Sequence, residues 1–482
     1  MKYILAIILI VSATTGFSQK YNIIDFGAAG DETTMNTTYI QKAIDECHKN
    51  GGTVVVPPGI FLTGTLILKN NVALEITHGA ILKASPYVKD FPQTIPSYRS
   101  YSDNFVTQSL IYAEKADNIS ISGSGTIDGS GDAPDFAVNR WLVRPYVIRF
   151  IQCTNIKIEG VRLINSPMWM QHYLACENLL ISNIDVYNHG NRNNDGLDID
   201  GCKNVVISNC IIDSDDDALC FKSTGPAICE NITVTNCIVS SHCNNIKFGT
   251  ETTGGFKNVS ITNCVVKQSA NDSVIYGTRE GQSGLALEIV DGGIMDGIVI
   301  SNISIDSVEV PIFIRLGNRA RKHTETAPEP EVGILKNIQI SNVIARDAGV
   351  ISSSITGIPG FYLDNINLSD ITIISNGGGK SIDVNGIIEN EDSYPSPYIF
   401  KSDLPSYGLY IRHAKNVTMR NINLIMDGKD ERVALVLDDV INGQFRDLRT
   451  AGLGEQQTKV WLHNAREIEM NDMEEIFIKR SH

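Results

Sequence analysis

The most constraining feature of this 482-residue chain is a short motif that recurs along much of its length. Each copy begins with Asn, or once with Gly, and continues with Ile, Val or Leu alternating with polar residues. The copies begin at Asn118, Asn155, Asn178, Asn204, Asn231, Asn258, Gly297, Asn337, Asn365 and Asn416. The central copies, from Asn155 to Asn258, are almost evenly spaced. A repeat of this kind indicates a solenoid, in which each unit packs only against its neighbours.

The pattern inside each copy predicts β-strands. Short runs in which Ile, Val and Thr alternate with polar residues fit a strand with one buried face, and turn residues separate the runs. One copy cannot bury its apolar face alone, but coils stacked about 4.8 Å apart share a continuous core. Matching Asn side chains would then form ladders. We therefore expect an all-β parallel solenoid, which is not limited to the roughly 250–300 residues of a compact core.

A short helix is expected to cover the open end of the solenoid, where bare strand edges would otherwise be exposed. Residues 35–50 place four apolar side chains at helical spacing, namely Ile40, Ala43, Ile44 and Cys47. Asn36 or Thr37 is the candidate N-cap, and Gly51 follows the predicted end.

The rest of the chain is expected to form one domain. Residues 19–482 are assigned to a single β-helix with loop insertions near 86–117, 318–333 and 376–410, which fit no coil. Long loops in compact proteins often line a functional site.

Residues 1–18 have the pattern of a signal peptide. Lys2 supplies a positive start, an apolar run follows over 3–11, and small residues near 16–18 offer a cleavage site. This predicts export to the periplasm or the extracellular space. The apolar run is shorter than the roughly 20 residues that span a membrane.

The cysteines and the charge narrow the alternatives. Cys210, Cys237 and Cys264 occupy the same position in successive repeats, which predicts a column of small buried side chains. A disulfide among the other cysteines stays open. The net charge of −15 disfavours nucleic acid and anionic membranes as partners. We expect a monomer.

A cluster of carboxylates stands out in residues 193–223. Asp195 precedes Asp216 and Asp217 by nearly one repeat, and His242 follows Asp217 by about one repeat more. We therefore expect these side chains in one column on the same wall of the solenoid. Neighbouring strand residues point to opposite faces, so Asp216 and Asp217 both reach a groove only if the backbone bends there.

Crowded carboxylates suit the hydrolysis of glycosidic bonds. Like charges at short range favour one carboxyl keeping its proton. That acid can protonate the leaving oxygen while another carboxylate activates water. The alternative is a solvated turn, because Asp is common in turns. The one-coil spacing favours the catalytic interpretation.

At these residues the chain resembles glycoside hydrolase family 28, the polygalacturonases and their relatives. The family motifs are Asn-Thr-Asp, Asp-Asp, Gly-His-Gly and Arg-Ile-Lys, in that order. Asn194-Asp195-Gly196 is similar to the first, Asp216-Asp217 to the second, and His242 keeps the central residue of the third. Other similar stretches lie at 25–28, 51–59, 123–129, 144–150 and 166–172, so that the similarity covers nearly all of residues 21–310.

The resemblance implies a right-handed parallel β-helix and an inverting hydrolase of pectin-type polysaccharide, either galacturonan or rhamnogalacturonan. Asp216 would be the general acid, and Asp195 with Asp217 would activate the water. His242 would hold the acid's proton by hydrogen bonding. Inversion typically needs carboxyl groups about 6.5–9.5 Å apart. No metal or other cofactor is implied, and the expected partner is a polysaccharide or oligosaccharide.

The fourth motif is missing. Aligning residues 284–288 puts Ala286 and Glu288 at the basic positions, and aligning 273–277 puts Val274 and Tyr276 there. In the family these cations bind the galacturonate carboxylate beside the cleaved bond.

Two interpretations of the missing cations stay open. Arg279, Arg315 or Arg319 replaces them, because an Arg fork suits a carboxylate, although a surface ion pair is the alternative for each. Otherwise the sugar is neutral, for instance rhamnose, and an exo-acting enzyme releases it. The candidate substrate-binding residues are Trp169, His172, Asn194, Tyr276, Arg279, Glu288, Asp291 and Arg315.

Two other function classes are compatible with a β-helix. A polysaccharide lyase would hold calcium with the acidic cluster and would need a basic residue to abstract a proton. The sequence suggests no Arg or Lys beside the cluster. A non-catalytic adhesin or binding module would need no clustered acids.

Overall fold

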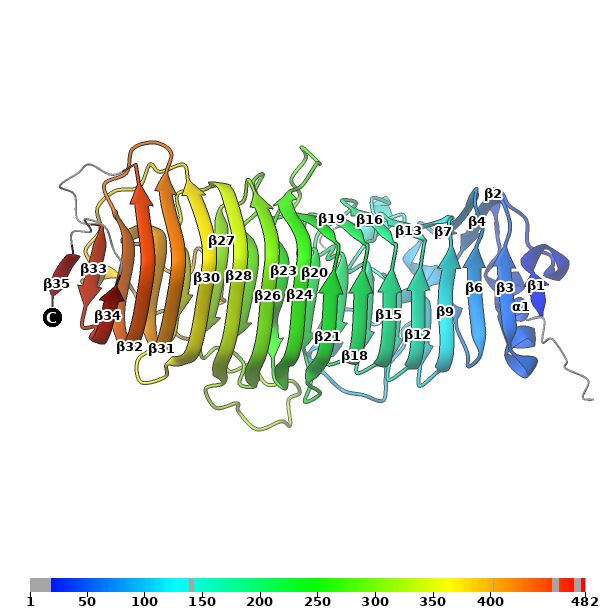
Figure 1. Cartoon of the computed structure of the whole chain (residues 1–482). Coiled ribbons are helices and arrows are strands. Elements are labelled where there is room, and N and C mark those ends of the chain that lie inside the picture. Colours follow the sequence, from blue (N-terminus) through cyan, green and yellow to red (C-terminus); the bar gives the residue numbers. More distant parts are fainter. Residues whose placement is uncertain (1–18, 138–142, 402, 453–458, 472–477, 482) are drawn as a thin grey trace, which may run out of the picture.

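The computed structural model describes residues 19–137, 143–401, 403–452, 459–471 and 478–481, which form a right-handed parallel β-helix (Figure 1). Parallel strands stack along the helix axis from the capping helix near the N-terminus to the last coil (Figure 1). The fold expected from the repeat is confirmed. The predicted signal peptide lies outside the described residues, and export stays a prediction.

The strands stack in three columns. The first contains β1 (Lys20–Asn22), β3 (Gly52–Val56), β6 (Val72–Ile76), β9 (Asp117–Gly123), β12 (Thr154–Glu159), β15 (Glu177–Ser182), β18 (Lys203–Ser208), β21 (Cys229–Thr235) and β34 (Arg466–Asn471). The second contains β2 (Asp31–Met35), β4 (Gly59–Thr63), β7 (Ala80–Ala84), β10 (Thr126–Asp128), β13 (Arg162–Ile164), β16 (Asp185–Asn188), β19 (Ile211–Ser214) and β22 (Ile238–Ser241). The third contains β5 (Leu66–Ile67), β8 (Ser109–Glu114), β11 (Tyr146–Ile151), β14 (Gln171–Leu174), β17 (Leu197–Asp200), β20 (Leu219–Ser223), β23 (Asn244–Thr252), β25 (Ser283–Ile289), β27 (Val310–Leu316), β29 (Ser353–Thr356), β33 (Val460–His463) and β35 (Ile478–Ser481).

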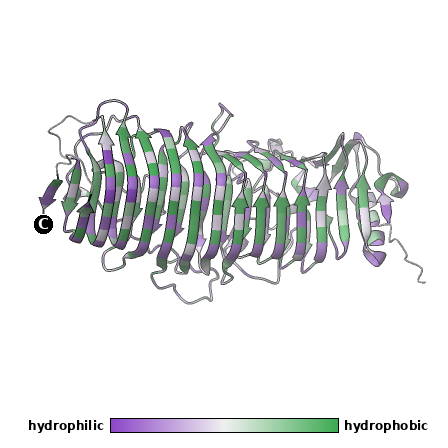
Figure 2. Ribbon diagram, in the orientation of Figure 1, coloured by the Kyte–Doolittle hydropathy of each residue, from purple (hydrophilic) through white to green (hydrophobic). Residues whose placement is uncertain are grey.

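Long strands join the columns in the C-terminal half. The first and second columns merge in β24 (Gly255–Gln268), β26 (Ile294–Asp306), β28 (Ile334–Ala348) and β30 (Leu363–Ser375). Two longer strands also pair with the third column, namely β31 (Ser406–Met426) and β32 (Val433–Ala451). Polar and apolar residues alternate along these strands, as Figure 2 shows.

An asparagine ladder runs along the first column, near the start of each strand. The side-chain amide of Asn178 donates to the side chain of Asn155 at 3.1 Å, and Asn204 donates to Asn178 at 3.1 Å. The ladder continues through Asn231 and Asn258. These residues have φ values of 51–59°, a left-handed conformation that Asn tolerates better than most residues. The predicted ladders are confirmed, and they explain why the repeat begins with Asn.

The capping helix α1 (Thr37–Asn50) ends before Gly51 and packs on the first coils. It buries the four apolar residues expected from its sequence, Ile40, Ala43, Ile44 and Cys47. Asn36 is the N-cap residue, as predicted, but its side-chain amide bonds the backbone of Ala29 instead of the helix.

All ten cysteines are buried and free. Cys210, Cys237 and Cys264 form the predicted column, since their strands pair in register. None of the described cysteines forms a disulfide.

Three loops extend from the coils, but two are shorter than expected. Residues 109–114 of the segment 86–117 form β8, and residues 406–410 begin β31. Both were missed because their side chains are nearly all buried and show no alternation. The short 3-10 helices are η1 (Ile23–Phe26), η2 (Val88–Asp90), η3 (Tyr101–Asn104), η4 (Pro134–Phe136) and η6 (Val384–Gly386). Within the described ranges, no helix has the length and apolar character needed to cross a membrane.

Candidate active site

The three predicted aspartates lie in the turns that lead into the third column. Asp195 precedes β17, while Asp216 and Asp217 lie between β19 and β20. Leu197 of β17 pairs with Leu219 of β20, so Asp195 and Asp217 occupy matching positions on adjacent coils. This turn provides the bend that both acids need to reach the groove, because strand β19 ends at Ser214, before the two acids.

Hydrogen bonds from three neighbours fix the backbone of the turn. Asn194 accepts the backbone N–H of Asp216 at 3.2 Å. The hydroxyls of Ser214 and Ser241 donate to the Asp216 carbonyl at 2.7 and 2.6 Å. Asn194 is fully buried and also bonds the backbone of Asn188. It therefore positions the acid and does not line the pocket, so a direct contact with substrate is not observed.

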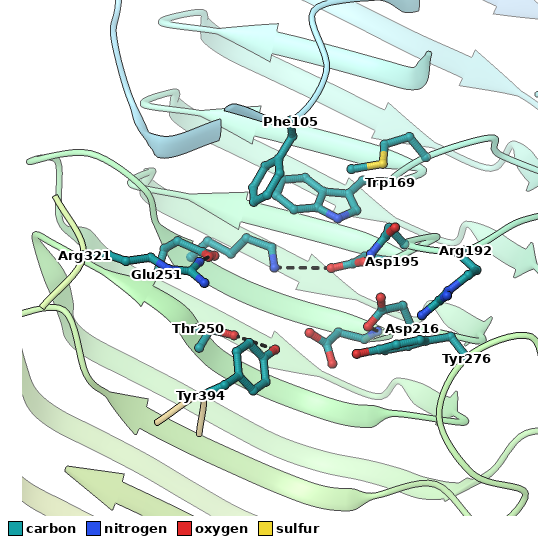
Figure 3. Close-up of a pocket in the computed structure, with 14 residues that line it drawn as sticks. Phe105, Trp169, Arg192, Asp195, Asp216, Thr250, Glu251, Tyr276, Arg321 and Tyr394 are labelled. Atoms are coloured by element: carbon teal, nitrogen blue, oxygen red, sulfur yellow. Dashed lines mark hydrogen bonds and ion pairs between the residues drawn. The ribbon is translucent and has the colours of Figure 1, made fainter. Parts of the chain in front are cut away.

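The aspartates open into a pocket of about 390 Å³ (Figure 3). This volume is near the lower end of the range for small-ligand sites, about 300–1,000 Å³. The lining residues are Phe105, Met168, Trp169, Arg192, Asn193, Asp195, Asp216, Asp217, Lys222, Thr250, Glu251, Tyr276, Arg321 and Tyr394.

The three loops contribute to the wall of this pocket. Phe105 lies in the first loop, Arg321 in the second and Tyr394 in the third. The Arg321 guanidinium lies 4.9 Å from the Tyr101 ring centre, so the first two loops meet. The Tyr394 hydroxyl accepts a hydrogen bond from Thr250 at 3.0 Å, which fixes the third loop on β23.

Two buried lysines accompany the aspartates. The Lys222 ammonium lies 3.2 Å from Asp195 and 3.4 Å from Asp198. The Lys247 ammonium lies 3.0 Å from Asp217, which also accepts a 2.7 Å hydrogen bond from Asn244. The expectation that no basic residue stands beside the cluster is therefore wrong.

A signal for these lysines was present in the sequence. Each directly neighbours a Phe within a strand, in LCFKS and in NNIKFGT. A buried lysine needs an anionic partner. Lys247 pairs in register with Ala286, where the family motif would have a cation one coil later. Lys247 thus lies one coil before that position, and it contacts Asp217.

Burial and charge separate the protonation states of the three aspartates. Burial, reinforced by Asp195 and Asp217, raises the pKa of Asp216 well above its usual value. Burial also raises the pKa of Asp195 to about 6, against the opposing charge of Lys222. Burial alone would raise the pKa of Asp217, but the ammonium groups of Lys247 and Lys222 lower it. Asp216 therefore keeps a proton while Asp217 stays ionised.

The oxygens of the aspartates are close together. An Asp217 oxygen lies within 4.8 Å of an Asp195 oxygen, and an Asp217 oxygen also lies within 4.8 Å of an Asp216 oxygen. This bound joins single oxygens, so the separation of about 6.5–9.5 Å expected between the acid and the base stays a prediction. Two O–H···O bonds of about 2.5–3.0 Å each reach across such a distance, so one water can bridge Asp195 and Asp217.

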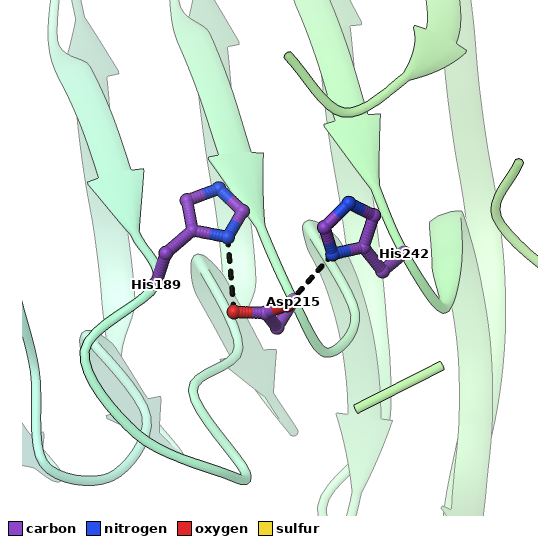
Figure 4. A group of neighbouring side chains, drawn as sticks. All are labelled: His189, Asp215 and His242. Carbon is purple, nitrogen blue, oxygen red and sulfur yellow. Dashed lines mark hydrogen bonds and ion pairs between the residues drawn. The ribbon is translucent and has the colours of Figure 1, made fainter. Parts of the chain in front are cut away.

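His242 lies outside the pocket, in a network with Asp215 and His189 (Figure 4). Its Nδ1 is 2.6 Å from Asp215 and its Nε2 is 2.9 Å from the Asn271 carbonyl. Leu219 pairs with Ile246, and this register places His242 opposite Asp215. The prediction that it holds the proton of Asp216 is wrong, because the coil between them is longer than assumed.

The network beside His242 is ionic. His189 bonds Asp215 at 3.0 Å and Asp213 at 3.1 Å. Burial alone would lower the pKa of His189, but these two carboxylates raise it. The network holds together the turns that carry Asp195 and Asp216, and it supports the site from behind.

The predicted arginines do not reach the pocket. Arg279 pairs with exposed Asp272 at 2.8 Å. Arg315 is fully buried and donates to Thr356 and to backbone carbonyls. Arg319 forms a two-point ion pair with Asp291. Arg279, Arg315 and Asp291 therefore do not line the pocket, and a direct contact with substrate is not observed for any of them.

The remaining candidates divide between the pocket and its surroundings. Trp169 and Tyr276 line the pocket. His172 is buried, with its ring 2.9 Å from Asp200, and it does not line the pocket. Glu288 is buried behind the wall, and burial raises its pKa to about 8. It does not line the pocket, so a direct contact with substrate is not observed.

Three groups of described side chains have possible metal-ligand atoms within 4.8 Å of one another. They are Asp195 with Asp217 and Cys220, Asp216 with Asp217 and Cys243, and His189 with Asp215 and His242. In the first two groups Asp217 already contacts an ammonium and an amide. In the third, every ring nitrogen already has a carboxylate or carbonyl partner. A metal ion would have to displace these contacts.

Known proteins share this fold and sequence pattern. A family model described as glycosyl hydrolases family 28 matches residues 52–396. The probable polygalacturonase of Vitis vinifera is 33% identical over 225 residues, which cover 44% of this chain and 46% of that protein. The exo-poly-alpha-D-galacturonosidase of Dickeya chrysanthemi is 28% identical over 262 residues, covering 44% of this chain and 43% of that protein. The chain spans somewhat less than half the length of these curated relatives.

The fold also matches a solved structure along most of its length. The crystal structure of a hyperthermoactive exopolygalacturonase from Thermotoga maritima has a TM-score of 0.63 and 25% sequence identity. The match covers 83% of this chain and 92% of that chain.

Proposed function

The chain belongs to glycosyl hydrolases family 28, and from this premise we propose that it hydrolyses α-glycosidic bonds in pectin-type polysaccharide. The main support is that two adjacent acids line one pocket and that their surroundings shift their pKa values in opposite directions. Asp216 is held protonated, while Asp217 is held ionised by Lys247. General acid–base hydrolysis requires one group of each kind.

Each aspartate has a distinct role in this mechanism. Asp216 donates its proton to the glycosidic oxygen as the bond to the anomeric carbon breaks. A water held between Asp195 and Asp217 gives up a proton to this pair and attacks the same carbon. Direct attack by water inverts the anomeric centre, whereas a covalent intermediate would retain its configuration. The lysines keep the water-binding carboxylates ionised and oriented.

The loops around the pocket support attack at a chain end. The loops that carry Tyr101 and Arg321 meet at one side, and Tyr394 lines another. Loops that narrow a groove in this way favour the end of a polymer over its middle. The names of the Dickeya chrysanthemi and Thermotoga maritima relatives agree with exo action. We therefore propose release of a terminal sugar, which is galacturonate, or rhamnose in the alternative.

The two buried lysines also argue against a polysaccharide lyase. Burial alone would lower the pKa of Lys222, but the acidic groups around it, including Asp195 and Asp198, raise it well above its usual value. An ammonium that stays protonated does not abstract a proton. Both lysines also place positive charge where a calcium ion would need carboxylates free.

The pH dependence of kcat/KM should be bell-shaped. Activity falls at high pH because Asp216 must be protonated, and its pKa lies well above the usual value. Activity falls at low pH when Asp195, with a pKa of about 6, takes up a proton. Initial rates from pH 4 to pH 9 measure both limbs. An acid limb that lies below pH 4 would show that Asp195 need not be ionised.

The proposed function is tested by the product. The protein is incubated with homogalacturonan, rhamnogalacturonan and their oligosaccharides, and the released sugar is followed by NMR. We expect a single terminal sugar whose first-formed anomer is β, inverted from the α-linkage. No released sugar from any of these substrates would refute the proposal. Export and a monomeric state are part of the proposal, and they rest on the sequence pattern of residues 1–18 and on composition.

A further inference from the structure

Within the described part of the chain, one cation of the pocket has no acidic partner. The cationic side chains that line the pocket are Arg192, Lys222 and Arg321. Lys222 contacts Asp195, and Arg321 lies 3.4 Å from Glu251. The exposed Arg192 side chain forms no ion pair or hydrogen bond with any described residue. Its charge is therefore available to a ligand.

The guanidinium of Arg192 is held in place without being neutralised. It lies 5.1 Å from the centre of the Tyr276 ring, an arrangement that favours stacking of the planar group. The buried Arg144 bonds the backbone carbonyl of Arg192 and the side chain of Asn193. Arg144 thus fixes the backbone of Arg192, and the ring of Tyr276 restricts the Arg192 side chain from one side.

Arg192 and Tyr276 lie at the Asp216 side of the pocket, whereas Arg321, Glu251 and Tyr394 lie at the opposite side (Figure 3). The general acid contacts the oxygen that departs with the leaving sugar. The opposite side is the one where the loops meet, so the terminal sugar occupies that side. Arg192 then faces the leaving sugar.

We propose that Arg192, oriented by Tyr276, binds the carboxylate of an acidic leaving-group sugar and so sets the specificity of that subsite. This inference rests on the proposed function. A guanidinium binds a carboxylate through two parallel hydrogen bonds, and no carboxylate of the described residues occupies this one. The chain thereby recognises a uronate from the turn before β17, although Ala286 and Glu288 occupy the basic positions of the fourth motif.

An acidic leaving sugar is compatible with either galacturonate or rhamnose as the terminal sugar. Galacturonate stands on the leaving side of a galacturonate–galacturonate bond and of a rhamnose–galacturonate bond. A neutral terminal sugar and an acidic leaving sugar are therefore compatible in one enzyme.

The test compares matched substrates that differ only in the leaving-group charge. Trigalacturonate and a rhamnosyl-galacturonate oligosaccharide are each used as the free acid and with a methyl ester only on the sugar next to the terminal one. For the substrate that the wild-type protein cleaves, we expect R192Q to lower kcat/KM on the free acid about tenfold or more. The rate on the methyl ester should change little, so the preference for the acid disappears. R192K should keep part of the preference.

R279Q is the matched control, because Arg279 is a cation outside the pocket that pairs with exposed Asp272. It should leave both rates unchanged. If R192Q folds, as thermal unfolding will show, and still prefers the free acid by the wild-type factor, the inference is wrong. If the wild-type protein cleaves neither of the two free-acid substrates, the proposed function itself fails. That result differs from a failure of the inference about Arg192 alone.

Discussion

Replacing Asp216 with Asn is expected to lower kcat/KM on the cleaved oligosaccharide by about 10²–10⁴-fold, the usual contribution of a general acid. The amide has nearly the same shape but cannot give a proton to the departing oxygen. The raised pKa of Asp216 is the reason that we propose it as the proton donor. The effect should appear in kcat, because the acid acts in the transition state. Steady-state rates on one oligosaccharide measure it.

Two controls separate chemistry from folding in the Asp216→Asn variant. Substrate binding, measured by calorimetry, should persist, and the melting temperature should not fall, because the variant removes no ion pair. Asp272→Asn changes an exposed carboxylate outside the pocket and should keep full activity. Wild-type turnover by Asp216→Asn would exclude it as the acid.

Replacing Lys247 with Met is expected to reduce both stability and activity. The change leaves the Asp217 carboxylate buried without its cation, and breaking a buried ion pair typically costs about 3–5 kcal/mol. Asp217 then takes up a proton at higher pH than in the wild type, so the base is lost near neutrality. Denaturant unfolding and kcat/KM measure the two losses.

The stability loss in Lys247→Met should itself depend on pH. Lys247 depresses the pKa of Asp217, so the pair stabilises the fold above the unfolded-state pKa and less as pH falls. The difference between wild type and variant should therefore shrink in acid. A second change, Asp217→Asn, should restore part of the stability at neutral pH but no activity. Lys257→Met removes an exposed lysine of β24 and should alter neither property. Equal stability of Lys247→Met and wild type would contradict the role given to the ion pair.

The repeat made the fold predictable, because its Asn residues and alternating strands each have one structural explanation. The Asn155 to Asn258 ladder lies where the motif begins. The acids were found for the same reason, since Asp195 and Asp217 lie one coil apart. His242 was misplaced because the next coil, in which Leu219 pairs with Ile246, is longer. Coil length varies with the turns, and the sequence alone does not mark where the extra residues lie.

The surroundings of the acids were harder to predict. The sequence places Lys222 and Lys247 in strands, but only the stacking of coils reveals which carboxylates they contact. Arg279 and Arg315 were plausible carboxylate binders by residue type, but their partners lie elsewhere in the chain. Arg192 was missed because it precedes the first motif, and its lack of an acidic partner among the described residues is a property of the folded pocket alone.

The central claim is that the three aspartates add water across a glycosidic bond. Its most direct test is the reaction in ¹⁸O-labelled water, with mass spectrometry of both products and ultraviolet absorbance of the mixture. We predict that the released sugar gains one labelled oxygen at its new reducing end, and that no absorbance from an unsaturated sugar develops. An unsaturated, ultraviolet-absorbing product without the label would contradict the account, because it would mean that the bond is broken by elimination.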